Sequence, residues 1–344
     1  MNNDYLVGGY GSGNLHYNCH SKFCSSGRLW PILETDKIDT MAFYFFGYYE
    51  QYLKLYYNED NIFGRNYYNV DIKLVDYPKF SVDIIEYVTK SEKFYPLFYS
   101  IIRNFKKYGL IDLENMFGLV YDSRYRPGIY IEKNLRNVLE KSKSLKNRRT
   151  SIITYSFGCI QILHALATYD ESFIMEHIDN LILISCPLGG SPASLLTLMT
   201  DYDDYIVFKD DKMYKMSDIG IFLPEQYPRY IYNSIDIENI FNLLDRIKYT
   251  KLVKLHCLYS TMLVNKTVKF FNVDFNDDDV LKYATKTLGD GTIPLNSLNA
   301  CDDFVSDYEN ILYIKGLNHT SILHDDRIIN YINKYVIYYH ILPN

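Results

Sequence analysis

The feature that most constrains the fold is a pair of uninterrupted apolar runs, each followed at once by a tight turn. The first run, Ser151–Tyr155, leads into Ser156-Phe157-Gly158 and then into a helical pattern over 159–169. The second run, Leu181–Ser185, is followed by the glycine-containing segment Cys186–Ser191. Strands that are apolar at every position are buried on both faces. They are typical of a parallel sheet with helices on both sides.

Other strands and helices alternate along the chain. In such sheets the functional residues lie in loops beyond the carboxyl ends of strands. We therefore expect one α/β unit over 1–344 whose important loops follow Val7, Tyr121, Tyr155, Ser185 and Ile314. The expected strands are 5–7, 71–75, 118–121, 253–259 and 311–314, and the expected helices are 97–107 and 132–143.

Composition excludes several classes of protein. The net charge is −6, which gives no global electrostatic reason to bind nucleic acid. None of the six cysteines has a C-x-x-C spacing, so we expect no zinc site. Separately, we expect no other metal and no cofactor. No apolar run reaches the roughly 18 residues of a transmembrane helix. The start, Met1–Asp4, lacks the basic and apolar regions of a secretory signal.

Ser156 is the candidate nucleophile. A serine hydroxyl becomes nucleophilic when it projects from a sharp strand-to-helix turn beside a base. The run Ser151–Tyr155, the turn at Ser156 and the following helix predict that geometry. The first glycine of the usual G-x-S-x-G pattern is replaced by Thr154. Taken alone, a serine at this junction is in most cases a helix N-cap.

Asp290 and His319 complete the chain order Ser, acid, His that α/β-hydrolases use. Asp290 lies in Leu288–Pro294 (LGDGTIP), and His319 follows a glycine loop after the late strand 311–314. In this arrangement His319 accepts the serine proton and Asp290 fixes its tautomer. Taken alone, the aspartate is explained as a D-G turn and the histidine as a surface residue. His324 is the rival base.

A second glycine-rich segment, Gly8–Gly13, follows the first expected strand. Its backbone can approach a substrate closely and can supply one N–H group of an oxyanion hole. We expect the N–H groups of Gly11 and Phe157 to form that hole. The segment lacks the G-x-G-x-x-G spacing of a dinucleotide site.

With these pieces in order, the chain resembles the lecithin:cholesterol acyltransferase family, which includes lysosomal phospholipases and phospholipid:diacylglycerol acyltransferases. The departures are Gly8 for a proline, Ser123 for a tryptophan, and Thr154 and Tyr155 for the two residues before the elbow serine. Six segments in the correct order carry the resemblance, and they are Leu6–Tyr10, Val120–Pro127, Thr154–Cys159, Cys186–Ser191, Gly289–Pro294 and Gly316–His319.

The resemblance implies further features. It implies a disulfide between Cys257 and Cys301, and a disulfide-closed lid loop around Cys19 and Cys24. It also implies a lid and membrane-contact insertion over 19–60 and a cap insertion over 195–245. The cysteine pair favours secretion or an organelle lumen, against the missing signal sequence.

The expected function is that of a serine-dependent lipid acyl hydrolase or O-acyltransferase with an α/β-hydrolase fold. Its expected substrate is a glycerophospholipid ester at a membrane surface, with water or a lipid alcohol as acyl acceptor. Two alternatives stay open: a catalytically inactive lipid-binding relative, and a neutral-lipid lipase or esterase.

Overall fold

The structure is a computed structural model of the 344-residue chain. It describes residues 4–7, 15–19, 27–30, 70–74, 80–89, 94–121, 128, 131–146, 148–191, 205–207, 213–215, 234–270 and 284–338. The expectations on Gly8–Gly13, Ser123 and Cys24 lie outside these residues.

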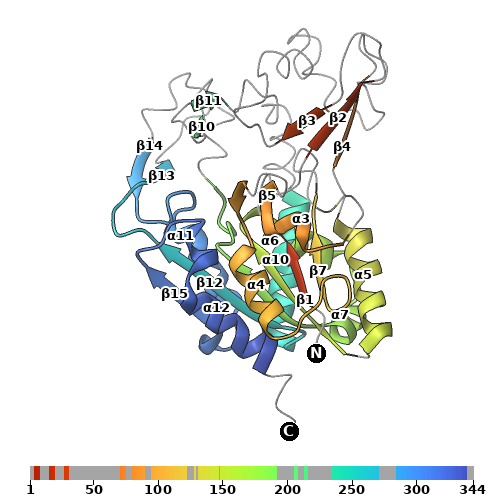
Figure 1. Ribbon diagram of the computed structural model, residues 1–344. Helices are drawn as coiled ribbons and strands as arrows, with labels where there is room; N and C mark the ends of the chain where they lie inside the picture. The colour runs from red at the N-terminus through yellow and green to blue at the C-terminus, as the bar shows by residue number, and fades with distance from the viewer. Residues whose placement is uncertain are drawn as a thin grey trace.

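A six-stranded parallel sheet forms the centre of the molecule (Figure 1), in the strand order β15-β12-β9-β8-β1-β7. The two apolar runs of the sequence become the adjacent strands β8 and β9, and every residue of β8 is buried. The predicted parallel sheet is therefore confirmed. The strands are β1 (Asp4–Val7), β7 (Met116–Leu119), β8 (Thr150–Tyr155), β9 (Ile178–Ile184), β12 (Lys254–Thr261) and β15 (Ile311–Lys315).

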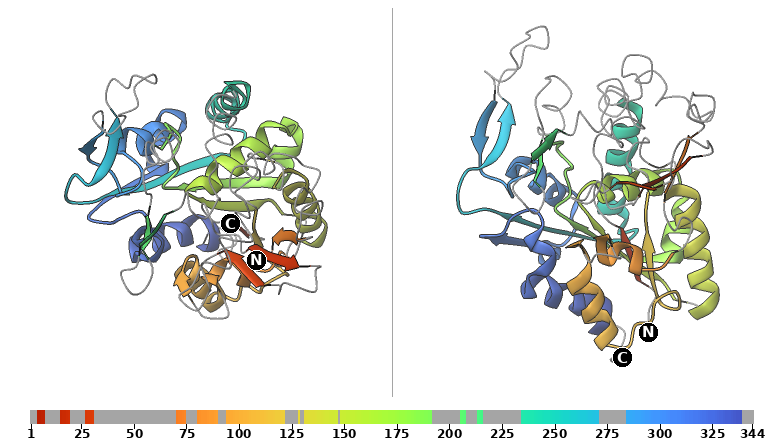
Figure 2. Two further views of the ribbon diagram at one scale, coloured as in Figure 1. Left: turned by 90° about the horizontal axis from the view of Figure 1, so that it is seen from above. Right: turned by 45° about the horizontal axis from the view of Figure 1, so that its top comes forward.

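Helices cover both faces of this sheet (Figure 2). Alternate residues of each central strand face opposite layers. Thus Ile152, Leu181 and Leu183 join the core beneath α5, α6, α7 and α10. The second layer contains α3, α4 and α12. The first layer comprises α5 (Ile131–Lys146), α6 (Phe157–Ala167), α7 (Glu171–His177) and α10 (Ser234–Thr250), and the second comprises α3 (Asp83–Glu86), α4 (Tyr99–Lys107) and α12 (Asp326–Asn333).

Smaller elements surround the central sheet. The strand expected near 71–75 pairs outside the central sheet, in a three-stranded sheet with two earlier strands. The small strands are β2 (Leu15–Cys19), β3 (Gly27–Trp30), β4 (Val70–Leu74), β5 (Tyr87–Thr89), β6 (Phe94–Pro96), β10 (Tyr205–Val207), β11 (Met213–Lys215), β13 (Thr267–Phe270) and β14 (Ala284–Thr287). The short helices are α11 (Leu295–Leu298), η5 (Asn299–Phe304), η6 (Tyr308–Asn310), η7 (Ser321–His324) and η8 (Lys334–Tyr338).

The two expected insertions fall largely outside the described residues, and their roles as lid and cap stay predictions. Within the described part, β3 lies inside 19–60, β2 ends at Cys19, and the β10–β11 hairpin lies inside 195–245, all at the top of Figure 1. Helix α10 also begins inside the second range, but it packs against α6 and buries Leu243, Leu244 and Ile247 in the core. Residues from Ser234 onward therefore belong to the helical layer on the sheet.

Cys257 and Cys301 form a disulfide that joins β12 to η5, with their Cα atoms 6.0 Å apart. Both residues are buried in the core beneath α10. Among the residues that the structure describes, no helix is both long enough and apolar enough to cross a bilayer.

Candidate active site

Ser156 lies at the turn between β8 and α6, where its backbone has φ 54° and ψ −129°. A non-glycine residue rarely adopts such a positive φ, and strain of this kind is concentrated at functional turns. The Ser156 N–H donates to the carbonyl oxygen of Ile184 in the neighbouring strand at 2.9 Å, which anchors the turn. The strand, turn and helix have the geometry of a nucleophile elbow. Together with the parallel sheet they give the chain the α/β-hydrolase fold.

Thr154 stands where the elbow pattern has its first glycine, and the structure accommodates its side chain. The residue is fully buried. Its hydroxyl lies 3.0 Å from Cys159 Sγ and 3.3 Å from the carbonyl oxygen of Ile182. The buried hydroxyl therefore has hydrogen-bond partners, which offset the free-energy cost of removing it from water.

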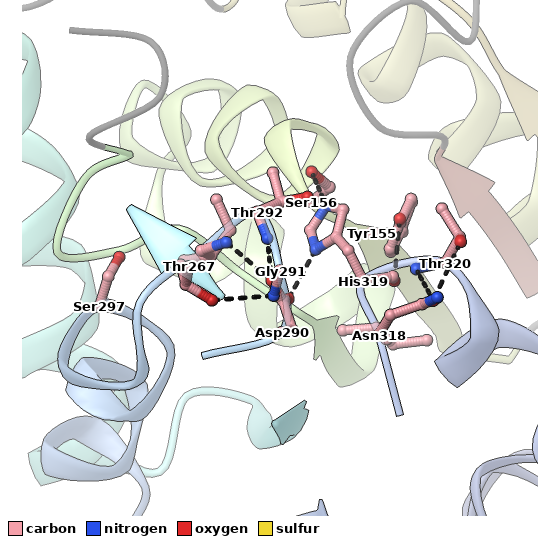
Figure 3. A network of polar contacts seen from close by, with 12 residues as sticks. Tyr155, Ser156, Thr267, Asp290, Gly291, Thr292, Ser297, Asn318, His319 and Thr320 are labelled. Carbon is pink, nitrogen blue, oxygen red and sulfur yellow. Dashed lines mark hydrogen bonds and ion pairs between the residues drawn. The ribbon is translucent and has the colours of Figure 1, made fainter. Parts of the chain in front are cut away.

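His319 lies between β15 and η7 and joins Ser156 to Asp290 (Figure 3). Its Nε2 is 2.8 Å from Ser156 Oγ, and its Nδ1 is 2.6 Å from Asp290 Oδ2. Both distances are in hydrogen-bond range. The structure thus brings together three side chains that are 134 and 29 positions apart in the sequence.

Asp290 is completely buried, and its orientation is fixed from two sides. Oδ1 accepts hydrogen bonds from the N–H groups of Thr292 at 2.9 Å and Ile293 at 2.7 Å. Its other oxygen, Oδ2, faces His319. The backbone carbonyl of Asp290 also accepts from the His319 N–H at 2.8 Å. The acid therefore holds both the ring and the main chain of the histidine.

The loop that carries Asp290, Leu288–Pro294 (the acid loop), depends on two glycines and on a contact from β13. A Cβ on Gly289 would lie 2.3 Å from the carbonyl oxygen of Ile293, so only glycine fits there. Gly291 adopts φ +96°, and its N–H donates to Thr267 Oγ1 at 2.9 Å. Sequence reasoning missed Thr267, because nothing local to it indicates a contact with a loop 24 residues away.

His324, the rival base, is directed elsewhere. Its Nδ1 is 2.9 Å from Ser100 Oγ in α4, and its Nε2 is 3.2 Å from the carbonyl oxygen of Pro96. Burial lowers the pKa of His324 from its ordinary value, and the contact with Pro96 opposes that shift. The ring nitrogens therefore attach η7 to α4 through Ser100 and to β6 through Pro96.

Of the two expected oxyanion donors, the structure describes Phe157 but not Gly11. Phe157 is the first residue of α6, so its N–H lies at the helix N-terminus directly after Ser156. Helix N-termini stabilise developing negative charge. Gly11 lies outside the described residues. Within the described part of the chain, no three His, Cys, Asp or Glu side chains are grouped as a metal site would require.

Comparison with known proteins gives one family. The lecithin:cholesterol acyltransferase family matches residues 51–293, which is more than half of the chain and includes Ser156 and Asp290. Phosphatidylcholine-sterol acyltransferase of Papio anubis is 20% identical over 81% of this chain and 71% of that protein. The human enzyme of the same name is 24% identical over 42% of this chain, and that alignment covers only 33% of the human protein. Among solved structures, Bacillus licheniformis lipase BlEst2 is 12% identical, with a TM-score of 0.41 over 69% of this chain and 83% of that chain.

Proposed function

Because the chain belongs to the lecithin:cholesterol acyltransferase family, we propose that it is a lipid acyl hydrolase or O-acyltransferase with Ser156 as nucleophile. The observation that carries the proposal is the 2.8 Å contact between Ser156 Oγ and His319 Nε2 at a strained elbow. The buried carboxylate of Asp290 behind the imidazole supports it.

In the proposed mechanism, His319 Nε2 takes the hydroxyl proton while Ser156 Oγ attacks the ester carbonyl. Asp290 keeps the remaining N–H on Nδ1 and stabilises the imidazolium that forms. The N–H groups of Phe157 and Gly11 would receive the oxyanion of the tetrahedral intermediate. Collapse expels the alkoxide, which is protonated by His319, and leaves an acyl group on Ser156. Water or a lipid alcohol then attacks this acyl-enzyme while His319 takes its proton, and collapse breaks the bond between the acyl carbon and Ser156 Oγ, which recovers a proton from His319.

The proposed substrate is a glycerophospholipid ester presented at a membrane surface. The family and its phosphatidylcholine-sterol acyltransferase members support a lipid substrate. The loop after β12 supports peripheral contact, because Leu263 is 81% and Val264 is 52% exposed there. This loop is adjacent to the loop of His319, since a Cβ on Gly316 would lie 3.8 Å from Leu263 Cδ2. Exposed apolar side chains beside a lipid site favour interfacial binding.

The test is the Ser156→Ala variant, assayed for fatty-acid release from phosphatidylcholine vesicles, triglyceride emulsions and soluble esters. A matched control is Ser142→Ala, which removes another buried serine hydroxyl, one bonded to Thr150 Oγ1 at 3.0 Å. We expect release from vesicles to disappear in Ser156→Ala and to persist in the control.

The other outcomes contradict the nucleophile, the turnover or the substrate class that we propose. Undiminished release by Ser156→Ala eliminates this nucleophile. A wild-type protein that binds vesicles without turnover is a lipid-binding relative. Faster turnover of emulsions than of vesicles indicates a neutral-lipid lipase. Product analysis with an added sterol or diacylglycerol identifies the acyl acceptor.

A further inference from the structure

Tyr155 immediately precedes Ser156 and is the last residue of β8. It is only 4% exposed, and its ring packs edge-on against Phe98 with centroids 6.4 Å apart. Packing on the second helical layer therefore fixes the position of the phenol.

The other neighbour of Tyr155 is His319. The Tyr155 hydroxyl donates to the backbone carbonyl oxygen of His319 at 3.0 Å (Figure 3). The phenol and imidazole rings also lie against each other, with centroids 5.0 Å apart and an interplanar angle of 37°. Tyr155 thus contacts both the main chain and the ring of the histidine.

These contacts complete a set of restraints on His319. Its N–H and Nδ1 are held by Asp290, its Nε2 by Ser156 and its carbonyl by Tyr155. Two consecutive residues therefore hydrogen-bond to the histidine: Ser156 contacts the reacting nitrogen of the ring, and Tyr155 contacts the main-chain carbonyl. We infer that Tyr155 is a positioning residue that fixes His319 against Ser156, an inference that rests on the proposed function.

The restraint matters because His319 is carried by a loop and not by a regular element. The loop begins at Gly316, which adopts φ +94°, and ends at Thr320 before η7. Proton transfer needs a heavy-atom distance of about 2.6–3.2 Å, and a misplacement of about 1 Å can cost about 10²-fold in rate. A hydroxyl that holds the loop carbonyl keeps the imidazole within this narrow range.

The experiment compares Tyr155→Phe with Tyr169→Phe. Tyr169 is also 4% exposed, and its hydroxyl also donates to a backbone carbonyl, that of Glu132, remote from Ser156. Both variants lose one buried hydroxyl and keep the ring. The measurements are kcat and KM on a soluble p-nitrophenyl ester, the rate of Ser156 labelling by a fluorophosphonate, and the midpoint of thermal unfolding.

For Tyr155→Phe we expect kcat and the labelling rate to fall about threefold to tenfold, with KM within about twofold of wild type. For Tyr169→Phe we expect both rates to stay at the wild-type level despite a similar shift in the unfolding midpoint. Wild-type kcat and labelling in folded Tyr155→Phe would overturn the inference. So would an equal loss of rate in Tyr169→Phe, because the effect would then be one of general stability.

Two further variants keep the test decisive. Tyr155→Leu loses the hydroxyl together with the ring contacts to Phe98 and His319, and wild-type kcat in folded Tyr155→Leu would equally overturn the inference. Ser156→Ala separates the inference from the proposed function. Activity that survives Ser156→Ala refutes both, whereas activity that is lost in Ser156→Ala and unchanged in Tyr155→Phe refutes only the role of Tyr155.

Discussion

Replacing Asp290 by asparagine tests the electrostatic part of the site with almost no change in shape. The buried side chain receives two backbone N–H groups on Oδ1 and faces His319 Nδ1 with Oδ2. An asparagine has one oxygen and one NH₂ group for these two places. If the NH₂ group faced Thr292 and Ile293, two buried donors would lose their acceptor, at about 1–3 kcal/mol each.

The asparagine oxygen therefore stays on the side of the backbone amides, and the NH₂ group turns toward His319. An NH₂ group donates to Nδ1, which forces the imidazole proton onto Nε2. In that tautomer His319 cannot accept the proton of Ser156. Where this change has been made in a Ser-His-Asp triad, kcat falls about 10⁴-fold. We expect a loss of the same order here, equivalent to about 5.4 kcal/mol of transition-state stabilisation.

The assay is fatty-acid release from phosphatidylcholine vesicles by Asp290→Asn and by the control Asp112→Asn. Asp112 also accepts one backbone N–H, from Val82 at 2.8 Å, and one side-chain donor, Ser81. The control should keep wild-type kcat. If Asp290→Asn retains more than about a tenth of wild-type kcat, Asp290 does not set the tautomer of His319, and the reasoning is refuted.

Three more predictions follow from other parts of the molecule. Burial lowers the pKa of His256 from 6.5 to about 3; below pH 6.5 this side chain then binds fewer protons in the folded state than in the unfolded state. Its contribution to the unfolding free energy should therefore fall by about 2 kcal/mol between pH 8 and pH 5. Urea unfolding should show a smaller fall in His256→Gln, and an equal fall would contradict the assignment. Exposed Leu263 should contribute to binding at the membrane surface. In a vesicle co-sedimentation assay, Leu263→Asp should therefore lower the affinity of the protein for vesicles about tenfold without changing kcat on a soluble ester. A simultaneous loss on the soluble ester would indicate damage to the site instead. Removing the disulfide by Cys257→Ala with Cys301→Ala, which opens a loop of 44 residues, should cost about 2–4 kcal/mol in urea unfolding, and an unchanged midpoint would refute this.

The sequence predicts the central sheet well because its signals are local. Apolar runs such as Ser151–Tyr155 and Leu181–Ser185 can be buried only between helical layers, and they form adjacent parallel strands. The family and the α/β-hydrolase fold are confirmed. The chain order Ser156, Asp290, His319 predicted the site, and the structure brings these side chains into contact, while their catalytic roles stay predictions.

Long-range pairing accounts for what the sequence does not reveal. The strand near 71–75 alternates apolar and polar residues like any other strand, but it pairs with β2 and not with a strand of the central sheet. Thr267 supports the acid loop across 24 residues, and Tyr155 reaches His319 across 164, so neither contact has a local signature. The expected cap range includes the first part of helix α10. The sequence shows a break in the strand and helix pattern, but it does not show where the next core element begins.

The central claim is that Ser156 is an activated nucleophile, and fluorophosphonate labelling followed by peptide mass spectrometry tests it most directly. Wild-type protein should carry the adduct on Ser156, and His319→Gln should label at least about 10²-fold more slowly, because the proton acceptor is gone. An adduct on a different serine, or equal labelling of His319→Gln, would contradict the claim.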